Sequence, residues 1–349
     1  MYQGNRVGVV VPVYNEAAFV GDVLDDLPAF VDRAYPVDDS STDRTWEVIQ
    51  RRVSAEAPVD RRPVEAGATE TETTADGGRA VEPTVVPIRH ETNRGRGGAV
   101  KTGYLAALDD GMDVVAAMDA DGQMDPELLD SLLDPVVAGE ADYAKGNRLA
   151  TPELREEMSS WRLFGNSLLT GLTRVASGYW GMSDPQNGYT AISSDLLRAL
   201  DIESLYEGYG FLNDVLVRLS VHDARVVDVP MSAVYGDEES GIEYTTFVPL
   251  LSLLLVSRFL WRLRSEYLSV GPHPVAVVYG LAGASGVGGL GYTVQSVVTR
   301  RALGPVAALV AIALCPVLVV AAFLLERRYN SDLKPDHDSD SDSDTDRSR

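Results

Sequence analysis

The chain has 349 residues, enough for one large domain or two, and 45% of them are hydrophobic, which excludes disorder throughout. A formal net charge of −22 argues against nucleic-acid binding, because phosphate backbones are held by clustered lysine and arginine. One cysteine, Cys315, excludes an intramolecular disulfide and a cysteine-based zinc site. The acidic, lysine-poor composition predicts a surface that stays hydrated at high salt, as in halophiles.

Strand-like and helix-like segments alternate in the first 120 residues. Val7–Val13 is apolar and lacks a cationic lead and a cleavage site, so it predicts a buried strand and not a signal peptide. The next predicted elements are helix Glu16–Val31, strand Ala34–Val37, helix Asp43–Val53, strand Val85–Ile88, helix Gly97–Leu108 and strand Val114–Met118. This alternation predicts an α/β fold, a mostly parallel, Rossmann-like sheet with helices on both faces.

Two segments lack the large apolar side chains that a core needs. Residues 55–83 are rich in Glu, Thr, Ala, Gly and Pro, and predict a mobile acidic insertion. Residues 327–349 contain an Asp-Ser repeat and predict a disordered acidic tail. Calcium binding is the alternative for that tail.

The last third of the chain has the composition of a membrane anchor. Val275–Val298 and Ala302–Leu325 contain no charged residue. As a helix, each would be roughly 36 Å long against a hydrocarbon core of about 30 Å, which predicts a two-helix transmembrane hairpin at residues 274–326. Arginines on both flanks place the amino-terminal domain in the cytoplasm and predict a multi-pass protein of the cell membrane.

Residues 241–270 precede the hairpin, and within them Phe247–Leu263 is apolar but interrupted by Arg258 and Arg262. We expect an amphipathic helix lying along the bilayer surface, and a third span is the alternative. Small residues recur at every fourth position in the first predicted span, namely Ala276, Gly280, Ala284 and Gly288. They either permit close contact between helices, including contact in an oligomer, or are merely tolerated in a membrane helix.

Two carboxylates directly follow the strand that ends at Met118. Asp119 and Asp121 lie at the carboxyl end of that strand, where open α/β sheets bind ligands. Carboxylates in this position can hold Mg²⁺ or Mn²⁺, which clamps a diphosphate, and Gln123 would add a neutral oxygen. The alternative is structural, with a turn at Asp121 and a helix cap at Asp119.

Three other loops follow strands of the same predicted sheet. PVYNE (residues 12–16) follows the first strand, DDSSTD (38–43) the second and NRGRGGA (93–99) the third. The glycines allow close backbone approach to a ligand, and the start of the following helix offers N–H groups to an anion. The order PVYNE, DDSSTD, DADGQ resembles the family 2 glycosyltransferases with the GT-A fold, and among them the polyprenyl-phosphate sugar transferases such as dolichyl-phosphate mannosyltransferases.

The resemblance covers about residues 6–240, so residues 1–240 are expected to form a GT-A domain. It implies an inverting enzyme that moves a sugar from a GDP- or UDP-linked donor to a polyprenyl (dolichyl) phosphate at the bilayer, with Mg²⁺ or Mn²⁺ as cofactor. Two alternative acceptors are the hydroxyl of a lipid-linked saccharide and a surface polysaccharide. An alternative of another class is a non-catalytic membrane scaffold that binds nucleotide sugars.

The resemblance also implies roles for individual residues. The nucleotide-sugar site would comprise Pro12, Tyr14, Glu16, Val37, Asp39, Asp119, Ala120, Asp121 and Arg148. The metal would be held by Asp119, Asp121 and Gln123, and the acceptor by Arg162, Asp184 and Gly188. Asp121, Arg148 and Asp214 would be catalytic. Asp214 would act as general base for a hydroxyl acceptor; its alternative is a first-turn carboxylate favoured by the helix dipole.

One stretch departs from the family pattern. Ala233 and Glu239 stand where relatives carry two cations near the donor diphosphate. We expect Lys101, Lys145 or Arg96 to substitute, or the loop to bind differently. The four histidines form no spaced set of metal ligands.

Overall fold

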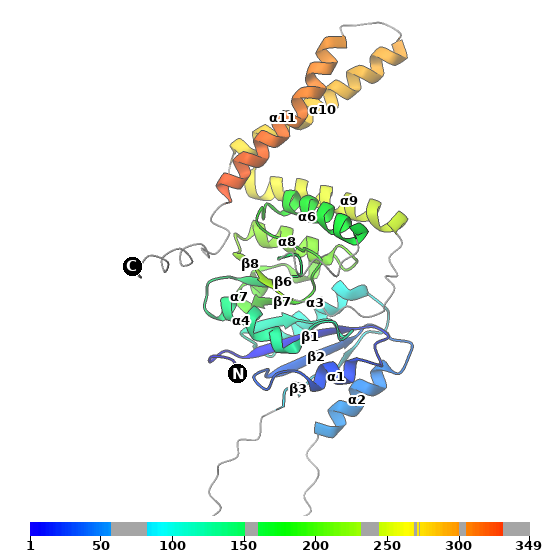
Figure 1. Ribbon diagram of the computed structural model, residues 1–349, viewed down its shortest axis with the longest axis vertical. Coiled ribbons are helices and arrows are strands. Elements are labelled where there is room, and N and C mark those ends of the chain that lie inside the picture. The colour runs from blue at the N-terminus through cyan, green and yellow to red at the C-terminus, as the bar shows by residue number, and fades with distance from the viewer. Residues whose placement is uncertain are drawn as a thin grey trace, which may run out of the picture.

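The computed structural model describes residues 1–56, 82–150, 160–231, 244–268, 271, 273–299 and 305–330. A sheet flanked by helices forms the body, two helices lie across its upper side in the view of Figure 1, and a pair of long helices projects beyond them. Ala233, Glu239, most of the predicted insertion and most of the predicted tail lie outside the described residues.

The described residues contain one eight-stranded sheet in the order β3-β2-β1-β5-β7-β6-β8, with β4 pairing beside β3 on β2. The pairs are parallel, except that β7 runs antiparallel to its neighbours β5 and β6. The predicted mostly parallel sheet is confirmed. The strands are β1 Val7–Val13, β2 Arg33–Asp38, β3 Thr84–Val85, β4 Ile88–Arg89, β5 Val114–Ala117, β6 Tyr143–Asn147, β7 Thr190–Ser193 and β8 Val226–Pro230.

Helices cover both faces of the sheet and create two hydrophobic cores. Alternate residues of β1 face opposite cores, with Val9 and Val11 on one side and Val10 on the other. Because both faces are covered, the strand is apolar throughout and shows no polar alternation. One core receives α1 (Val20–Asp25), α2 (Thr45–Glu56) and α4 (Leu129–Val137), and the other α3 (Gly95–Asp109), α7 (Ser194–Ala199) and α8 (Phe211–Val221).

Several predicted boundaries are wrong. The helix expected at Glu16–Val31 is the short α1, because the chain turns at Asn15, which has a positive φ of 59°, and leaves the helix after Asp25. The strand expected at Val85–Ile88 is divided into β3 and β4, because Pro87 has no N–H to donate to the ladder. The predicted insertion begins at residue 55, but α2 continues to Glu56. The predicted tail begins at residue 327, but α11 continues to Tyr329.

The carboxyl-terminal helices lie on the side of the body formed by α8. Helix α9 (Tyr244–Arg262) packs against α6 (Ser160–Ser177) and α8, and a π-helical turn, Leu263–Tyr267, follows it. One set of α9 side chains is more than half exposed and forms an apolar face: Leu250, Leu253, Val256 and Leu260. This exposed face supports the predicted location along a bilayer.

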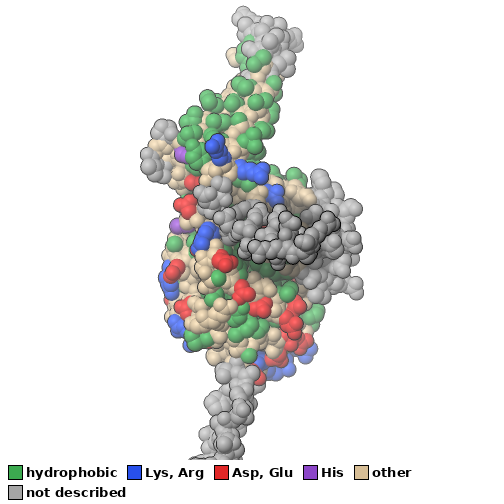
Figure 2. Space-filling view, turned by 60° about the vertical axis from the view of Figure 1, so that its left-hand side comes forward, with side chains coloured by type: hydrophobic (Ala, Val, Ile, Leu, Met, Phe, Trp, Pro, Cys, Tyr) green, Lys and Arg blue, Asp and Glu red, His purple; other side chains and the backbone are tan. Residues whose placement is uncertain are grey.

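Helices α10 (Pro274–Thr299) and α11 (Pro305–Tyr329) pack along each other as the projecting pair. Figure 2 shows hydrophobic side chains over this pair, whereas acidic side chains gather on the body. Among the described residues, one stretch, Pro274–Ser296, is long and apolar enough to cross a membrane. The two-span hairpin therefore stays a prediction, although its helix-pair geometry is present.

Two glycines of the small-residue stripe of α10 do not pack against α11. A Cβ on Gly280 or Gly288 would meet no atom within 4 Å, whereas one on Gly286 would lie 3.1 Å from Cys315 Sγ. Close packing of the helix pair therefore occurs at Gly286, and oligomerisation through the stripe stays a prediction.

A buried ionic cluster joins the helix pair to the body. Arg262 of α9 is fully buried, and its guanidinium lies 2.6 Å from Glu326 of α11, which is also fully buried. Arg262 Nε donates to the carbonyl of Ala176 in α6, and the Tyr279 hydroxyl of α10 donates to Glu326. One arginine thus joins α9, α11 and the body of the protein.

Candidate active site

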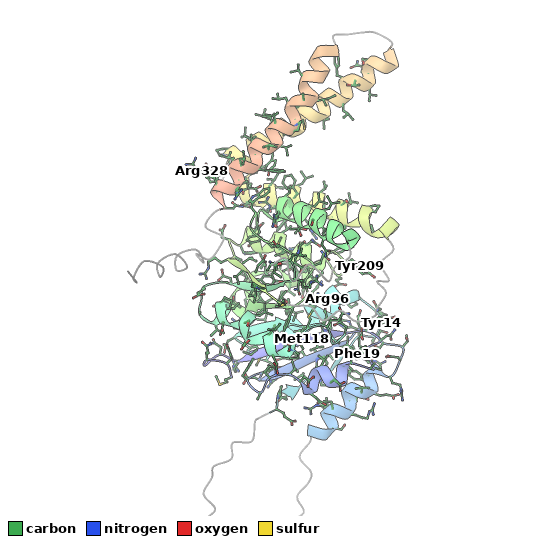
Figure 3. The ribbon with its side chains drawn as sticks, in the orientation of Figure 1. Tyr14, Phe19, Arg96, Met118, Tyr209 and Arg328 are labelled. Atoms are coloured by element: carbon green, nitrogen blue, oxygen red, sulfur yellow. The ribbon has the colours of Figure 1, made fainter. Side chains whose placement is uncertain are left out.

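Loops from three neighbouring strands meet at one edge of the sheet. Because β1, β2 and β5 are parallel and adjacent, the segments after Val13, Asp38 and Ala117 leave the sheet on the same side. In Figure 3, Tyr14 and Phe19 mark this edge where β1 ends, and Arg96 lies above them. The predicted convergence of these loops at the carboxyl ends of the strands is present.

A cavity of about 90 Å³ opens at this edge, beside the end of β5. Five of the predicted site residues line it: Asp119, Asp121, Gln123, Arg148 and Gly188. The rest of the lining consists of residues for which no individual role was predicted from the sequence, namely Met124, Asp125, Leu128, Gln186, Asn187, Tyr189 and Met231. The cavity thus brings the three predicted metal-binding residues together with Arg148 and with Gly188, one of the three residues predicted to bind the acceptor.

The cavity offers oxygen ligands of the kind that Mg²⁺ and Mn²⁺ prefer. Asp119, Asp121 and Gln123 supply two carboxylates and an amide on one lining. Among the described residues, no group of three or more His, Cys, Asp or Glu side chains forms a closed metal cage. Magnesium sites commonly use one or two carboxylates and complete their shell with substrate phosphates and water, so these residues fit such an ion.

Asp121 also serves the local fold. The backbone N–H of Gln123 donates to Asp121 Oδ1 at 3.0 Å, and Gly122 between them has a φ of 72°. The turn considered as an alternative from sequence is therefore present, and it places Asp121 and Gln123 on the cavity lining together. The turn and a metal-binding role are compatible.

Asp119 makes an ion pair at the cavity edge. Arg96 Nε, in the first turn of α3, donates to Asp119 Oδ1 at 2.6 Å, and the same guanidinium donates to the Gly188 carbonyl at 3.1 Å. Burial alone would lower the pKa of Arg96, but the charge of Asp119 and its hydrogen bond raise it above its ordinary value. The guanidinium is therefore a permanent positive charge beside the predicted metal ligand.

The predicted nucleotide-binding residues lie along the ends of β1 and β2. Pro12 and Val37 are buried strand residues, Ala120 is buried after β5, and Tyr14 is half exposed. Glu16 lies in the loop between β1 and α1. Of the predicted nucleotide-binding residues, Tyr14 is the one with an aromatic side chain, and about half of it is exposed to solvent.

Asp39 is buried and engaged by groups of the protein itself. Its carboxylate accepts from the backbone N–H groups of Arg94 and Gly95 at 2.9 and 2.7 Å. His90 Nδ1 lies 2.7 Å from Asp39 Oδ1, and His90 Nε2 lies 2.9 Å from Thr102 Oγ1. Asp39 therefore holds the start of α3 against β2, and contact with a nucleotide stays a prediction. No spacing pattern in the sequence marks His90 as its partner.

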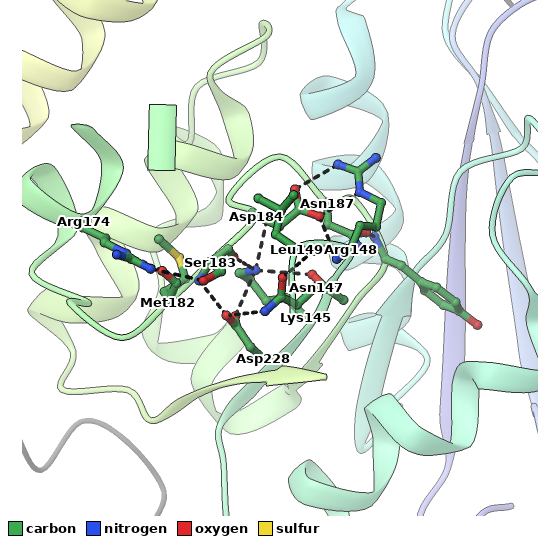
Figure 4. Close-up of polar contacts among 12 residues, drawn as sticks. Lys145, Asn147, Arg148, Leu149, Arg174, Met182, Ser183, Asp184, Asn187 and Asp228 are labelled. Carbon is green, nitrogen blue, oxygen red and sulfur yellow. Dashed lines mark hydrogen bonds and ion pairs between the residues drawn. The ribbon is translucent and has the colours of Figure 1, made fainter. Parts of the chain in front are cut away.

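Arg148 is held at the cavity by Asp184. Its Nε and terminal nitrogen donate to the two carboxylate oxygens of Asp184 at 2.7 and 2.9 Å (Figure 4). Burial would raise the pKa of Asp184, but the hydrogen bonds and charge of Arg148 lower it below its ordinary value. Asp184 is fully buried, so its role here is to orient Arg148, and direct contact with an acceptor stays a prediction.

The two lysines considered as substitute cations are buried and paired elsewhere. Lys145 contacts the Asp228 carboxylate at 3.0 Å and donates to the carbonyls of Ser183 and Asp184 (Figure 4). Lys101 contacts Glu207 at 2.9 Å and donates to two backbone carbonyls. Of the three candidates, Arg96 is the one whose guanidinium lies against a residue lining the cavity.

Asp214 lies away from this lining, between α8 and α9. It is fully buried; Oδ2 accepts from the Tyr206 N–H at 2.7 Å and from Arg218 at 3.3 Å, and Oδ1 lies 2.7 Å from Arg258 Nε of α9. The pairing with Arg258 was not predictable, because it depends on how α9 packs. The base role stays a prediction, and the geometry gives Asp214 a structural one. Arg162 lies in the first turn of α6, and its side chain lies outside the described residues.

Comparison with known proteins identifies the family. The sequence profile described as glycosyl transferase family 2 matches residues 8–62 and 70–201, more than half of the chain. The chain belongs to glycosyl transferase family 2. It is therefore a glycosyltransferase, and the resemblance drawn from PVYNE, DDSSTD and DADGQ is confirmed.

Two relatives indicate the branch of the family. The chain is 25% identical over 230 residues to the UDP-N-acetylglucosamine–dolichyl-phosphate N-acetylglucosaminyltransferase of Methanococcus voltae, covering 66% of this chain and 86% of the relative. It is 31% identical over 244 residues to the undecaprenyl-phosphate mannosyltransferase of Micrococcus luteus, covering 66% and 84%. The mannosyl-3-phosphoglycerate synthase structure from Rubrobacter xylanophilus shares the fold, with a TM-score of 0.50 at 19% identity and 75% coverage of each chain.

Proposed function

We propose that this glycosyltransferase moves a sugar, with inversion, from a nucleoside-diphosphate sugar to a polyprenyl (dolichyl) phosphate at the membrane. The observation that carries the proposal is the single cavity lined by Asp119, Asp121, Gln123 and Arg148 at the carboxyl ends of the strands. The names of both relatives include a polyprenyl phosphate acceptor, which supports the same acceptor here.

The cavity residues divide into two functional sides. On the donor side, Asp119, Asp121 and Gln123 would hold Mg²⁺ or Mn²⁺, which when bound neutralises charge on the departing nucleoside diphosphate. On the other side, Asp184 orients Arg148, whose planar guanidinium suits a phosphate oxygen pair. Both sides lie on one lining, so a donor and an acceptor phosphate would meet there.

The arrangement favours a phosphate acceptor over a hydroxyl acceptor. A phosphate oxygen is anionic at neutral pH and attacks without a base, whereas a hydroxyl needs one. Asp214, the predicted base, is enclosed by Arg218 and Arg258 and does not line the cavity. We therefore assign Asp214 to holding α8 against α9.

We propose a membrane location on three features. Pro274–Ser296 can cross a bilayer, α9 exposes an apolar face, and Arg262 fixes α9 to α11 through Glu326. The cavity would then face the level at which the phosphate of a polyprenyl lipid leaves the bilayer. The body would lie on the cytoplasmic side, as the arginine distribution predicts.

The proposed reaction is tested by following label into lipid. Membranes containing the chain are incubated with a panel of radiolabelled GDP- and UDP-sugars, and the lipid extract is counted. One donor is expected to label a lipid, and mild acid is expected to release the label, as for a sugar phosphodiester. Label that resists mild acid would instead support transfer to the hydroxyl of a lipid-linked saccharide.

Replacing Asp214 by Asn tests its assignment. We expect a lower melting temperature, because two arginines lose their charged partner in a buried place, with a loss of about 3 kcal/mol in the free energy of unfolding. The rate per folded molecule should fall by less than about tenfold and keep its pH profile. A loss of activity above about 10²-fold with unchanged stability would identify Asp214 as the base. Asp195→Asn, at a nearly fully exposed carboxylate, is the matched control.

A further inference from the structure

Arg96 and the predicted metal compete for the same carboxylate. The guanidinium contacts Asp119 Oδ1 at 2.6 Å, and Asp119 is one of the two carboxylates that would hold a divalent ion. A divalent ion on Asp119 would therefore lie within a few ångströms of a positive charge. Because like charges repel more strongly in a partly buried place than in water, the two cations oppose each other when no phosphate is bound.

The local backbone is shaped around this ion pair. A Cβ on Gly188 would lie 2.1 Å from the terminal nitrogen of Arg96 and 2.8 Å from Asp119 Oδ2. Any residue other than glycine would therefore push the guanidinium or the carboxylate out of place. Gly188 also accepts a hydrogen bond from Arg96 through its carbonyl, so the guanidinium is fixed at two points.

A bound nucleoside diphosphate would replace this repulsion between the divalent ion and Arg96 with attraction of both to its oxygens. Its oxygens carry negative charge, so a divalent ion and a guanidinium on either side of them are both attracted to the same ligand. We propose that Arg96 makes binding of the divalent cation conditional on the nucleoside diphosphate, so that ion and donor load together. This inference rests on the proposed function, because it requires a nucleotide in the cavity.

The proposal predicts effects of opposite sign on two binding constants. Removing the charge with Arg96→Gln is expected to tighten Mn²⁺ binding in the absence of nucleotide by roughly three- to tenfold. UDP or GDP is expected to increase the Mn²⁺ affinity of the wild type. In Arg96→Gln this increase should be smaller by a similar factor. A substitution that merely damages the site would weaken Mn²⁺ binding both with and without nucleotide. Tighter Mn²⁺ binding without nucleotide therefore distinguishes the proposed role of Arg96 from damage to the site.

Mn²⁺ binding is measured by electron paramagnetic resonance of the free ion, on the full chain in detergent, with and without UDP and GDP. Arg96→Lys keeps a positive charge and should lie closer to wild type than Arg96→Gln does. Arg198→Gln, which removes an exposed arginine paired with Asp195 elsewhere, should match wild type. If Arg96→Gln does not fold, Arg96→Met removes the charge with a side chain of similar reach.

The outcomes separate this inference from the proposed function. In one outcome, nucleotide increases Mn²⁺ binding by the wild type, but Arg96→Gln binds Mn²⁺ alone no more tightly than the wild type does. This result would overturn the role of Arg96 and leave the proposed function standing. Wild type that binds neither UDP nor GDP in the presence of Mn²⁺ would overturn both. Tighter Mn²⁺ binding by Arg96→Gln without nucleotide, together with a smaller increase in Mn²⁺ affinity on adding UDP or GDP, would support the proposed role of Arg96.

Discussion

Replacing Asp121 by Asn is expected to lower the rate of sugar transfer by about 10²-fold or more, because the cavity loses one of the two carboxylates that we propose hold the metal. Asn keeps an oxygen that can accept the hydrogen bond from the Gln123 N–H, so the turn and the melting temperature should be preserved. Initial rates of label transfer across a Mn²⁺ titration measure the effect.

The Mn²⁺ titration also identifies the cause of the loss. If Asp121 acts through the ion, high Mn²⁺ should restore part of the rate in Asp121→Asn. Asp195→Asn removes an exposed carboxylate and should leave the rate unchanged. Transfer at the wild-type rate by Asp121→Asn would show that the enzyme does not use this carboxylate, and the metal assignment would fail.

The second large effect is expected at the junction between the body and the helix pair. Glu326→Gln leaves Arg262 without its nearest carboxylate, although Gln can still accept from the Tyr279 hydroxyl. Removing one partner of a buried ion pair costs about 3 kcal/mol, which corresponds to a fall of roughly 5–10 °C in the melting temperature. Thermal unfolding of the detergent-solubilised chain measures it.

A double substitution shows whether the ion pair or the packing causes the loss. Arg262→Met together with Glu326→Gln removes both charges, and we expect its melting temperature to exceed that of Glu326→Gln alone. Glu140→Gln, at an exposed position, should leave the melting temperature unchanged. A Glu326→Gln variant with the same melting temperature as the wild type would show that the ionic cluster does not fix the helix pair to the body.

The sequence predicted the cavity through strand positions. A strand that is buried on both faces is apolar throughout, so the polar run from Asp119 to Gln123 marks the point at which β5 ends. Parallel neighbours then bring their own carboxyl ends to the same edge. These two local signals place Asp119, Asp121 and Gln123 at the edge where β1 and β2 also end. The positions of Arg148 and Gly188 in the site were implied by the family resemblance and not by strand positions.

The partners of those residues were not predictable in the same way. Arg96 meets Asp119 only because the first turn of α3 lies beside the segment after β5, and Arg258 reaches Asp214 only because α9 lies on α8. Arg262 interrupts an apolar segment and indicated a surface position, yet it is fully buried against Glu326. Tertiary packing decides such contacts, and neither periodicity nor spacing carries that information.

The proposed acceptor is tested most directly by comparing two lipids that differ only in the phosphate. The purified chain is reconstituted with dolichyl phosphate or with dolichol, and supplied with Mn²⁺ and the labelled donor identified in membranes. We expect label in the dolichyl phosphate sample alone, with loss of the product when a chelator removes the ion. Equal transfer to dolichol, or donor binding without transfer to either lipid, would contradict the account.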